Sequence, residues 1–306
     1  MRLINVETLA PEDFPDDRAP SYAILSHTWG DDAEELSLSD VKAGNLENKP
    51  GIGLAKLRGC SKQARNDGFG YIWIDTCCID KANLVELSEA INSMFRWYRQ
   101  ASVCYAYLSD VLDDRDPQHT KGSTFRSSRW FRRGWTLQEL LAPRSVVFYN
   151  SRWRRLGTKT RLRPLLEEIT GVPQRYLKGT GNLISASVAQ RMSWAARRET
   201  TRKEDMAYCL LGLFDIAMPL IYGEGGDRAF FRLQEQIMRN TKDHSILAWG
   251  LSPSSTGPAV LQSRSKGFLA VAPSEFADSG RIVPRNPLTS YLDLVEISGG
   301  SLHVSL

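Results

Sequence analysis

The chain has 306 residues, of which 42% are hydrophobic and 24% are charged. This composition is typical of globular proteins and allows one large domain or two smaller ones with a buried core. The net charge of +4 comes from residues that are scattered apart from two short basic stretches at 126–133 and 152–163. It therefore disfavours nucleic-acid binding, which usually relies on a dense basic patch interleaved with exposed aromatic residues.

The sequence predicts a cytoplasmic protein. Residues 1–14 carry Glu7, Glu12 and Asp13 and no apolar run of signal-peptide length, and no later segment approaches the roughly 20 apolar residues that a membrane span needs. The five cysteines include no C-x-x-C pair and have no paired histidines nearby, which argues against a disulfide framework and a zinc site. We expect reduced thiols, no metal and no bound cofactor.

The first half alternates β-rich runs with helix-period segments, which is typical of βαβ units around a parallel sheet. In chain order the predicted elements are a strand at 22–26, a helix at 54–67, a strand at 71–75, a helix at 86–100, a strand at 103–108, a short helix at 134–141 and a strand at 145–149. Residues 110–128 are rich in Asp, Ser and Gly and predict a long loop, a kind of segment that is often functional.

The second half predicts helices, followed by a change of composition. Helix-period apolar positions occur at 161–169, 187–197, 204–214 and 229–239. A Ser-, Pro- and Gly-rich stretch at 252–258 predicts a linker, and strand-like runs follow at 267–271, 291–297 and 302–306. We expect one domain at 1–250, with its sheet at about 20–150 and its helices at about 151–250. Residues 251–306 would then hold a linker and the start of a β-rich region that the sequence cuts short, as in part of a longer protein.

Polar residues follow three of the predicted strands. They are Ser26-His27-Thr28-Trp29-Gly30-Asp31, Asp75-Thr76-Cys77-Cys78 and Ser109-Asp110. In an open parallel sheet, ligands bind at the carboxyl ends of the strands, so these loops are candidates for a site. Cys77 is disfavoured as a nucleophile because no histidine is placed beside it by sequence.

The helix predicted at 134–141 carries an aromatic residue and a carboxylate. Trp135 and Glu139 are four residues apart and are expected on one helix face. Apolar surroundings would raise the pKa of Glu139, and Arg132 and Arg133 would lower it. The alternative is a buried tryptophan with a solvated glutamate.

Two later groups have a structural and a functional interpretation. Charged residues between two predicted helices predict either a salt-bridged junction or a phosphate site; they are Arg197, Arg198, Arg202, Glu204 and Asp205. The Tyr222-Gly-Glu-Gly225 turn is too short for a phosphate-binding loop and predicts a simple connection to the next helix.

Four stretches carry a further pattern. They are Tyr22-Ala-Ile-Leu-Ser-His-Thr-Trp-Gly30, Tyr71-Ile-Trp-Ile-Asp-Thr-Cys-Cys-Ile-Asp80, Arg132-Arg-Gly-Trp-Thr-Leu-Gln-Glu139, and Met192-Ser-Trp-Ala-Ala-Arg197 continuing to Asp205-Met-Ala-Tyr-Cys-Leu-Leu-Gly212. In sequence and order they resemble the signatures of the HET (heterokaryon incompatibility) domain family. The resemblance implies a fungal module whose activation leads to programmed cell death. It also implies an α/β fold with a parallel, TIR-like (flavodoxin-like) sheet flanked by helices and an added helical subdomain.

The resemblance extends to a possible chemistry. Trp135-Thr-Leu-Gln-Glu139-Leu140 is similar to the W-C-x-x-E-L helix of NAD-cleaving TIR enzymes, with Thr136 in place of the cysteine. This similarity implies a hydrolase that uses NAD as its substrate and Glu139 as its catalytic carboxylate. Nicotinamide leaves NAD as a neutral base, so no general acid is needed, and one carboxylate can stabilise the cationic ribose that remains.

The resemblance also implies substrate-binding residues. Ser26, His27, Thr28, Trp29 and Gly30 would hold ribose or phosphate groups through hydroxyls and backbone N–H groups. Trp29 or Trp135 would stack on a ring of NAD, with core packing as the alternative for both. Asp75 would orient the ribose or, alternatively, cap the next turn.

A rival hypothesis comes from a different functional class. In it the domain is a non-catalytic death-signalling scaffold that acts by self-association, and Glu139 is structural. Under either hypothesis we expect a homo-oligomer on activation, with an upstream sensor of the nucleotide-binding or repeat-domain kind that accompanies HET domains.

Overall fold

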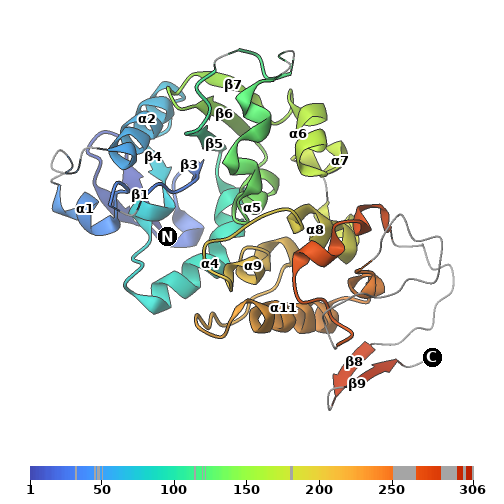
Figure 1. Ribbon diagram of the computed structural model, residues 1–306. Helices are drawn as coiled ribbons and strands as arrows, with labels where there is room; N and C mark the ends of the chain where they lie inside the picture. Colours follow the sequence, from blue (N-terminus) through green and yellow to red (C-terminus); the bar gives the residue numbers. More distant parts are fainter. Residues whose placement is uncertain are drawn as a thin grey trace.

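A computed structural model consists of a β-sheet with helices on both faces and a second half built mainly of helices (Figure 1). It describes residues 1–31, 33–44, 46, 49, 51–113, 115–118, 120, 122–179, 182–250 and 267–283, and two short strands at 295–298 and 301–304. Within these ranges no helix is long and apolar enough to cross a membrane.

In the described part of the chain, seven strands form one sheet in the order β2-β1-β4-β3-β5-β6-β7. Their bounds are β1 Arg2–Asn5, β2 Pro11–Asp13, β3 Tyr22–His27, β4 Tyr71–Trp73, β5 Val103–Leu108, β6 Val146–Asn150 and β7 Arg155–Thr158. The central strands β4, β3, β5 and β6 are parallel to one another. They are the four strands that the sequence predicts, and counted along the chain their order across the sheet is second, first, third, fourth.

The prediction of a wholly parallel sheet is wrong at both edges. β1 pairs antiparallel with β2 and β4, and β7 pairs antiparallel with β6, so the sheet is mixed. β1 and β2 are only 4 and 3 residues long, and β7 lies in a basic segment. None of the three carries the apolar run by which a central strand is recognised.

The described residues form eleven α-helices. Their bounds are α1 Leu38–Ala43, α2 Ile52–Asn66, α3 Asp75–Cys78, α4 Leu84–Gln100, α5 Thr136–Leu141, α6 Arg163–Thr170, α7 Gln174–Leu177, α8 Val188–Ala195, α9 Asp205–Tyr208, α10 Leu211–Phe214 and α11 Gly226–Asn240. The helix predicted at 204–214 is divided into α9 and α10. The backbone N–H of Leu210 bonds three residues back, to Ala207, and that of Leu213 bonds to Leu210, which tightens the chain at the division.

Side-chain directions along β5 separate the two faces of the sheet, because successive residues of a strand point to opposite sides. Cys104 lies on the α5 face, where its Sγ is 3.9 Å from the Glu139 carbonyl oxygen. Tyr105 lies on the α2 face, where its hydroxyl donates to Asp67 over 2.5 Å. Ser26 of β3 is paired with Ala106 of β5 and therefore shares the α5 face with Cys104. This register directs the Ser26 hydroxyl to helix α5.

α5 is held at its C-terminal end by a buried lysine. Lys159, with 1% of its surface exposed, donates to the carbonyl oxygens of Leu140 at 3.0 Å and of Pro143. Burial lowers the pKa of Lys159 to about 8. A cation at a helix C-terminus satisfies carbonyl groups that have no partner within the helix.

The segment at 267–283 packs on the helical half. The strand predicted at 267–271 is absent, because the backbone N–H and C=O of Ala270 bond to the side-chain amide of Gln234 on α11, at 3.1 and 2.7 Å, instead of to another strand. Two 3-10 turns follow, Pro273–Phe276 and Ser279–Arg281. The described parts of the other two predicted strands form an antiparallel pair, β8 Val295–Ser298 and β9 Ser301–Val304. The linker predicted at 252–258 lies outside the described residues.

Candidate functional site

The polar loops after β3 and β4 meet, as the sequence predicts. Asp75, the first residue of α3, takes one hydrogen bond from Trp29 Nε1 to Oδ2 at 2.7 Å. Its other oxygen, Oδ1, is 2.8 Å from His27 Nε2. Both carboxylate oxygens thus turn back to the β3 loop, so the alternative in which Asp75 caps a turn is wrong.

Trp29 lies at the outer edge of this site. Its side chain is 42% exposed, which excludes core packing as its role. The ammonium of the exposed Lys81 lies 3.5 Å from the centroid of the indole ring, in a cation–π contact. Trp29 therefore lies between the partly buried Asp75 carboxylate on one side and solvent on the other.

Glu139 lies beneath this loop on the α5 face of the sheet and is 6% exposed. Its Oε2 accepts a hydrogen bond from the Ser26 hydroxyl, and Ser26 Oγ in turn accepts one from Trp130 Nε1 at 2.8 Å. The Tyr98 hydroxyl bonds to the carbonyl oxygen of Leu25 at 2.9 Å and also reaches the Glu139 carboxyl. Two hydroxyl groups, those of Ser26 and Tyr98, therefore contact the Glu139 carboxyl, and each also has a second hydrogen-bond partner inside the protein.

The two carboxyl groups of the site have opposite electrostatics. Burial and the negative charge of Asp75 raise the pKa of Glu139 to about 8, against the opposing effects of Ser26, Arg198 and Tyr98. Burial also disfavours ionisation of Asp75, but His27, Lys81 and the Trp29 N–H outweigh it and hold the Asp75 pKa well below its usual range. Asp75 is thus charged at neutral pH, whereas Glu139 is largely protonated.

The loop at Thr28 and Gly30 is fixed from inside the protein. Lys56 of α2, 1% exposed, donates to the Thr28 carbonyl at 3.0 Å and forms an ion pair with Glu35. Glu35 Oε1 also accepts the Gly30 N–H at 2.8 Å. The Gly30 N–H is therefore already hydrogen-bonded within the protein. It is not free to bind a phosphate group, which is the role that the family resemblance implies for it. The Thr28 hydroxyl is buried and has no hydrogen-bond partner within the described part of the chain.

Trp135 is not part of this cluster. Its Nε1 donates to Asp205 Oδ2 of α9 at 3.1 Å, and Asp205 Oδ1 accepts from the Tyr222 hydroxyl at 3.0 Å. The tryptophan that shares a partner with Glu139 is Trp130, which lies in the 3-10 turn just before α5. The cation that acts on Glu139 is likewise Arg198, rather than Arg132 or Arg133 as predicted.

The residues after β5 have a structural role. Asp110 accepts hydrogen bonds from the Ser128 hydroxyl and the Arg129 N–H, both at 2.7 Å, and Arg129 donates to Ser109 at 3.1 Å. These contacts fasten the turn that carries Trp130. Cys77 is buried, and burial raises the pKa of its thiol to about 12, which agrees with its exclusion as a nucleophile.

The charged group at 197–205 is a junction, but hydrogen bonds rather than ion pairs hold its described contacts. Glu204 Oε1 accepts the backbone N–H groups of Gly223 and Gly225, at 3.0 and 3.1 Å, so the turn at 222–225 encloses a carboxylate of the chain itself. Arg202 stacks over the Tyr222 ring, 4.4 Å from its centroid. This arrangement favours the structural interpretation over a phosphate site.

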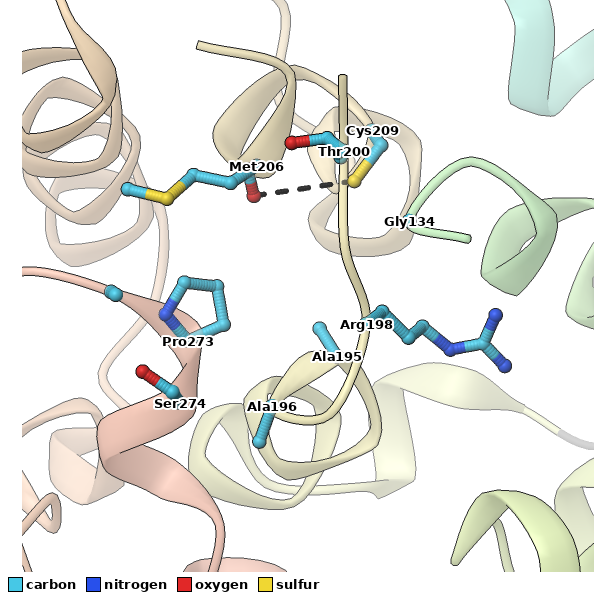
Figure 2. Close-up of a pocket in the computed structure, with 10 residues that line it drawn as sticks. Gly134, Ala195, Ala196, Arg198, Thr200, Met206, Cys209, Pro273 and Ser274 are labelled. Atoms are coloured by element: carbon cyan, nitrogen blue, oxygen red, sulfur yellow. Dashed lines mark hydrogen bonds between the residues drawn. The ribbon is translucent and has the colours of Figure 1, made fainter. Parts of the chain in front are cut away.

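A cavity of about 180 Å³ lies apart from the Ser26–Glu139 contact (Figure 2). Its walls come from the segment before α5, from α8 and the following loop, from α9 and the residue after it, and from the turn at 272–274. They are formed by Gly134, Ala195, Ala196, Arg198, Thr200, Met206, Cys209, Ala272, Pro273 and Ser274. Figure 2 shows Arg198 leaving the wall with its guanidinium directed away from Met206 and Pro273. None of the residues predicted to bind substrate lines this cavity.

Several residues of the site are missing from the sequence prediction. They are Lys56, Lys81, Tyr98, Trp130 and Arg198. Tyr98 lies in the helix predicted at 86–100, and nothing in that pattern distinguishes its hydroxyl from the other residues of the helix. Trp130 lies two residues before the third signature, which begins at Arg132, so that pattern does not single it out.

Comparisons with known proteins agree with the sequence resemblance. A profile of the family described as "Heterokaryon incompatibility protein (HET)" matches residues 22–124, and one described as a domain of unknown function (DUF8212) matches residues 228–298. Over 240 residues, 78% of this chain, the sequence is 49% identical to the vegetative incompatibility protein HET-E-1 of Podospora anserina. The chain spans 17% of the length of that relative. No solved structure matches this chain.

The matched span of the HET profile contains the β3 loop and Asp75, and Glu139 lies beyond its end. The four signatures along the chain, the profile match and the 49% identity to an incompatibility protein agree with one another. This chain therefore carries a domain of the heterokaryon incompatibility (HET) family.

Proposed function

We propose that this domain is the effector of a fungal incompatibility response and that it kills by cleaving NAD at the N-glycosidic bond to nicotinamide. The observation that carries the proposal is the Glu139 carboxyl, held by Ser26 on the face of the sheet below the carboxyl ends of β3 and β4. The negative charge of Asp75 acts on Glu139, and the two carboxyl groups differ in charge at neutral pH, which supports a shared role.

The order of the parallel strands supports a TIR-like arrangement. Counted along the chain it is second, first, third, fourth, which agrees with the first four strands of the flavodoxin-like order. In such sheets the ligand crevice lies where the order reverses, here between the carboxyl ends of β3 and β5. Ser26 and His27, the last residues of β3, and Trp29 in the loop after it lie at that point.

The chemistry requires an ionised Glu139. The nicotinamide ring of NAD is cationic, and a cation close to a carboxyl group favours its charged form. Binding of NAD is therefore proposed to ionise Glu139, which then stabilises the positive charge that develops on the ribose as neutral nicotinamide leaves. Asp75, ionised throughout, would orient a ribose hydroxyl, and Trp29 would stack on a ring of the substrate.

Assembly is proposed as the switch for this activity. With 6% of Glu139 exposed, the side chains around it must rearrange before a ribose can reach the carboxyl. Contact between copies of the domain, triggered by an upstream sensor, would supply that rearrangement.

A non-catalytic scaffold is the second candidate. The observation that favours it is the position of Glu139, which is buried and hydrogen-bonded inside the protein as a structural residue would be. In this case Glu139 would support the fold, and signalling would depend on self-association.

Expression in fungal cells separates the two candidates. We would compare cell death and total NAD after induction of the unaltered chain, of Glu139→Gln, and of Glu89→Gln, an exposed glutamate on α4 as a matched control. The enzyme proposal expects that only Glu139→Gln preserves both viability and NAD at equal protein level. If cells that express a soluble Glu139→Gln variant die while their total NAD is unchanged, the result would favour the scaffold.

A further inference from the structure

Arg198, in the loop after α8, contacts the first turn of α5. Its Nη1 donates to the Arg133 carbonyl oxygen at 2.9 Å and to Thr136 Oγ1 at 3.0 Å, and its Nε is 3.3 Å from the Trp194 carbonyl oxygen. The contact to Thr136 spans 62 positions of the chain. A residue of the helical half thus reaches the helix that bears Glu139.

Neighbours of Arg198 hold the same turn by backbone contacts. The Glu199 N–H bonds to the Arg132 carbonyl oxygen at 2.6 Å, and the Gly134 N–H bonds to the Glu199 carbonyl oxygen at 2.8 Å. The approach is close, since a Cβ on Gly134 would lie 2.5 Å from the Thr200 side chain. The segment at 198–200 therefore has a fixed position relative to α5.

The Thr136 hydroxyl is the side-chain partner of Arg198 on α5. Its hydroxyl accepts from Arg198 and lies 2.5 Å from the Trp130 carbonyl oxygen, to which it can donate. A thiol is a weaker donor and acceptor than a hydroxyl. Threonine at this position therefore suits an arginine partner.

One nitrogen of the Arg198 guanidinium, Nη2, makes none of these hydrogen bonds. Nη2 is buried and has no hydrogen-bond partner among the residues that the structure describes. Burial lowers the pKa of Arg198 to about 10, so the group stays protonated at neutral pH. An unpaired cationic donor in the interior is costly unless a negative charge develops near it.

The titratable groups that act on Glu139 come from several elements. They are Asp75 on α3, Tyr98 on α4, Cys104 on β5, and Arg198 from the helical half. Among these four groups, Arg198 is the cation. Asp75 disfavours ionisation of Glu139 by charge repulsion, so Arg198 is the charge that offsets it.

We propose that Arg198 is the positioning residue of this site: its Nη1 group fixes the first turn of α5, and its free Nη2 group stabilises Glu139 when that carboxyl ionises. The fourth sequence signature of the family then has a purpose in the reaction, because it delivers this guanidinium from the helical half. The catalytic part of the inference rests on the proposed NAD cleavage, whereas the effect on the ionisation of Glu139 does not.

The test is a direct titration of Glu139. Protein labelled with ¹³C at the glutamate carboxyl carbons would be followed by NMR between pH 5 and 10, with the Glu139 signal assigned by its loss in Glu139→Gln. We would compare the unaltered chain with Arg198→Met, Arg198→Lys and Arg197→Met, the last being a matched control at the exposed neighbouring position.

We expect Arg198→Met to move the Glu139 midpoint to higher pH by about one pH unit. Arg198→Lys, which keeps the charge without the planar fork, should move it less, and Arg197→Met should leave it unchanged. An unchanged midpoint in Arg198→Met, or an equal change in Arg197→Met, would overturn the inference. If Arg198→Met does not fold, Thr136→Val decides instead: it removes the contact that aims the guanidinium and should raise the midpoint in a folded protein.

Nicotinamide release provides the second readout. In Arg198→Met, kcat/KM for NAD should fall at least tenfold at pH 7 and recover partly at higher pH, whereas loss of structure alone would give no pH-dependent recovery. A shifted NMR midpoint without NAD cleavage in any variant would keep the Arg198–Glu139 coupling and reject the proposed reaction. Cleavage of NAD with an unshifted Glu139 midpoint in Arg198→Met would keep the proposed reaction and reject the Arg198–Glu139 coupling.

Discussion

The Ser26 hydroxyl donates to the carboxyl of Glu139, a residue 113 positions away in the chain. Ser26 is the fifth residue of β3, and Glu139 lies in the middle of α5. The contact joins two of the stretches by which the sequence resembles the HET family. Their separation in sequence and proximity in space make this contact the centre of the site.

Ser26→Ala tests that centre. The substitution removes the donor to Glu139 and leaves the Trp130 N–H without an acceptor in the core, so we expect a loss of about 1–3 kcal/mol in the free energy of unfolding. Urea denaturation would measure it, with Ser102→Ala as the control because Ser102 is exposed. Equal stabilities for the two variants would show that the buried bonds contribute little.

Glu139→Gln should stabilise the protein in a pH-dependent way. Burial raises the Glu139 pKa to about 8, so between about pH 4.5 and 8 the folded protein retains a proton that the unfolded chain releases. Stability from this group is therefore lost as the pH rises through that window. The gain from Glu139→Gln, measured by urea denaturation, should be about 3 kcal/mol larger at pH 8 than at pH 5. A gain independent of pH would mean that Glu139 is ionised in the folded protein at both values.

The buried pair Lys56–Glu35 should behave as one unit. Lys56→Met leaves Glu35 as an unpaired buried charge and the Thr28 carbonyl without its donor, and we expect it to cost about 3 kcal/mol or more. Combined with Glu35→Gln, it should cost clearly less than the sum of the two single changes. Unfolding free energies of the four proteins complete this cycle, and strict additivity would contradict the role assigned to the pair.

Trp29 should matter for substrate and little for stability. Trp29→Leu removes an exposed ring, so its free energy of unfolding should change by less than about 1 kcal/mol. If the ring stacks on NAD, the KM for NAD should rise roughly tenfold, the equivalent of about 1.4 kcal/mol. Phe231→Leu on α11 is the control, because that aromatic side chain is 41% exposed. Unchanged kinetics in Trp29→Leu would remove Trp29 from the binding site.

The sequence predicts the part of the site that strand ends define. A parallel sheet places the carboxyl ends of neighbouring strands side by side, so the meeting of His27 and Trp29 with Asp75 follows from the assignment of two strands. The same reasoning identified the four central strands, whose apolar runs are unmistakable. The edge strands β1, β2 and β7 were not predicted, because they are short and contain polar or basic residues.

The spacing of residues along the sequence does not predict the contacts that irregular segments make. Trp135 and Glu139 are four residues apart, yet Trp135 forms the N-cap of α5 and turns to Asp205, while the preceding 3-10 turn brings Trp130 to Ser26. The pairing of Arg198 with Thr136 depends on how two halves of the chain pack. Such long-range choices are set by tertiary packing and leave no local pattern in the sequence.

The most direct test of the account is nicotinamide release by the purified chain. The protein would be incubated with NAD at low and high protein concentration, with Glu139→Gln and Glu89→Gln in parallel, and the products separated by chromatography. We expect nicotinamide release that rises more steeply than protein concentration and is lost in Glu139→Gln but kept in Glu89→Gln. Release that survives in Glu139→Gln, or no release by the unaltered chain at any concentration, would contradict it.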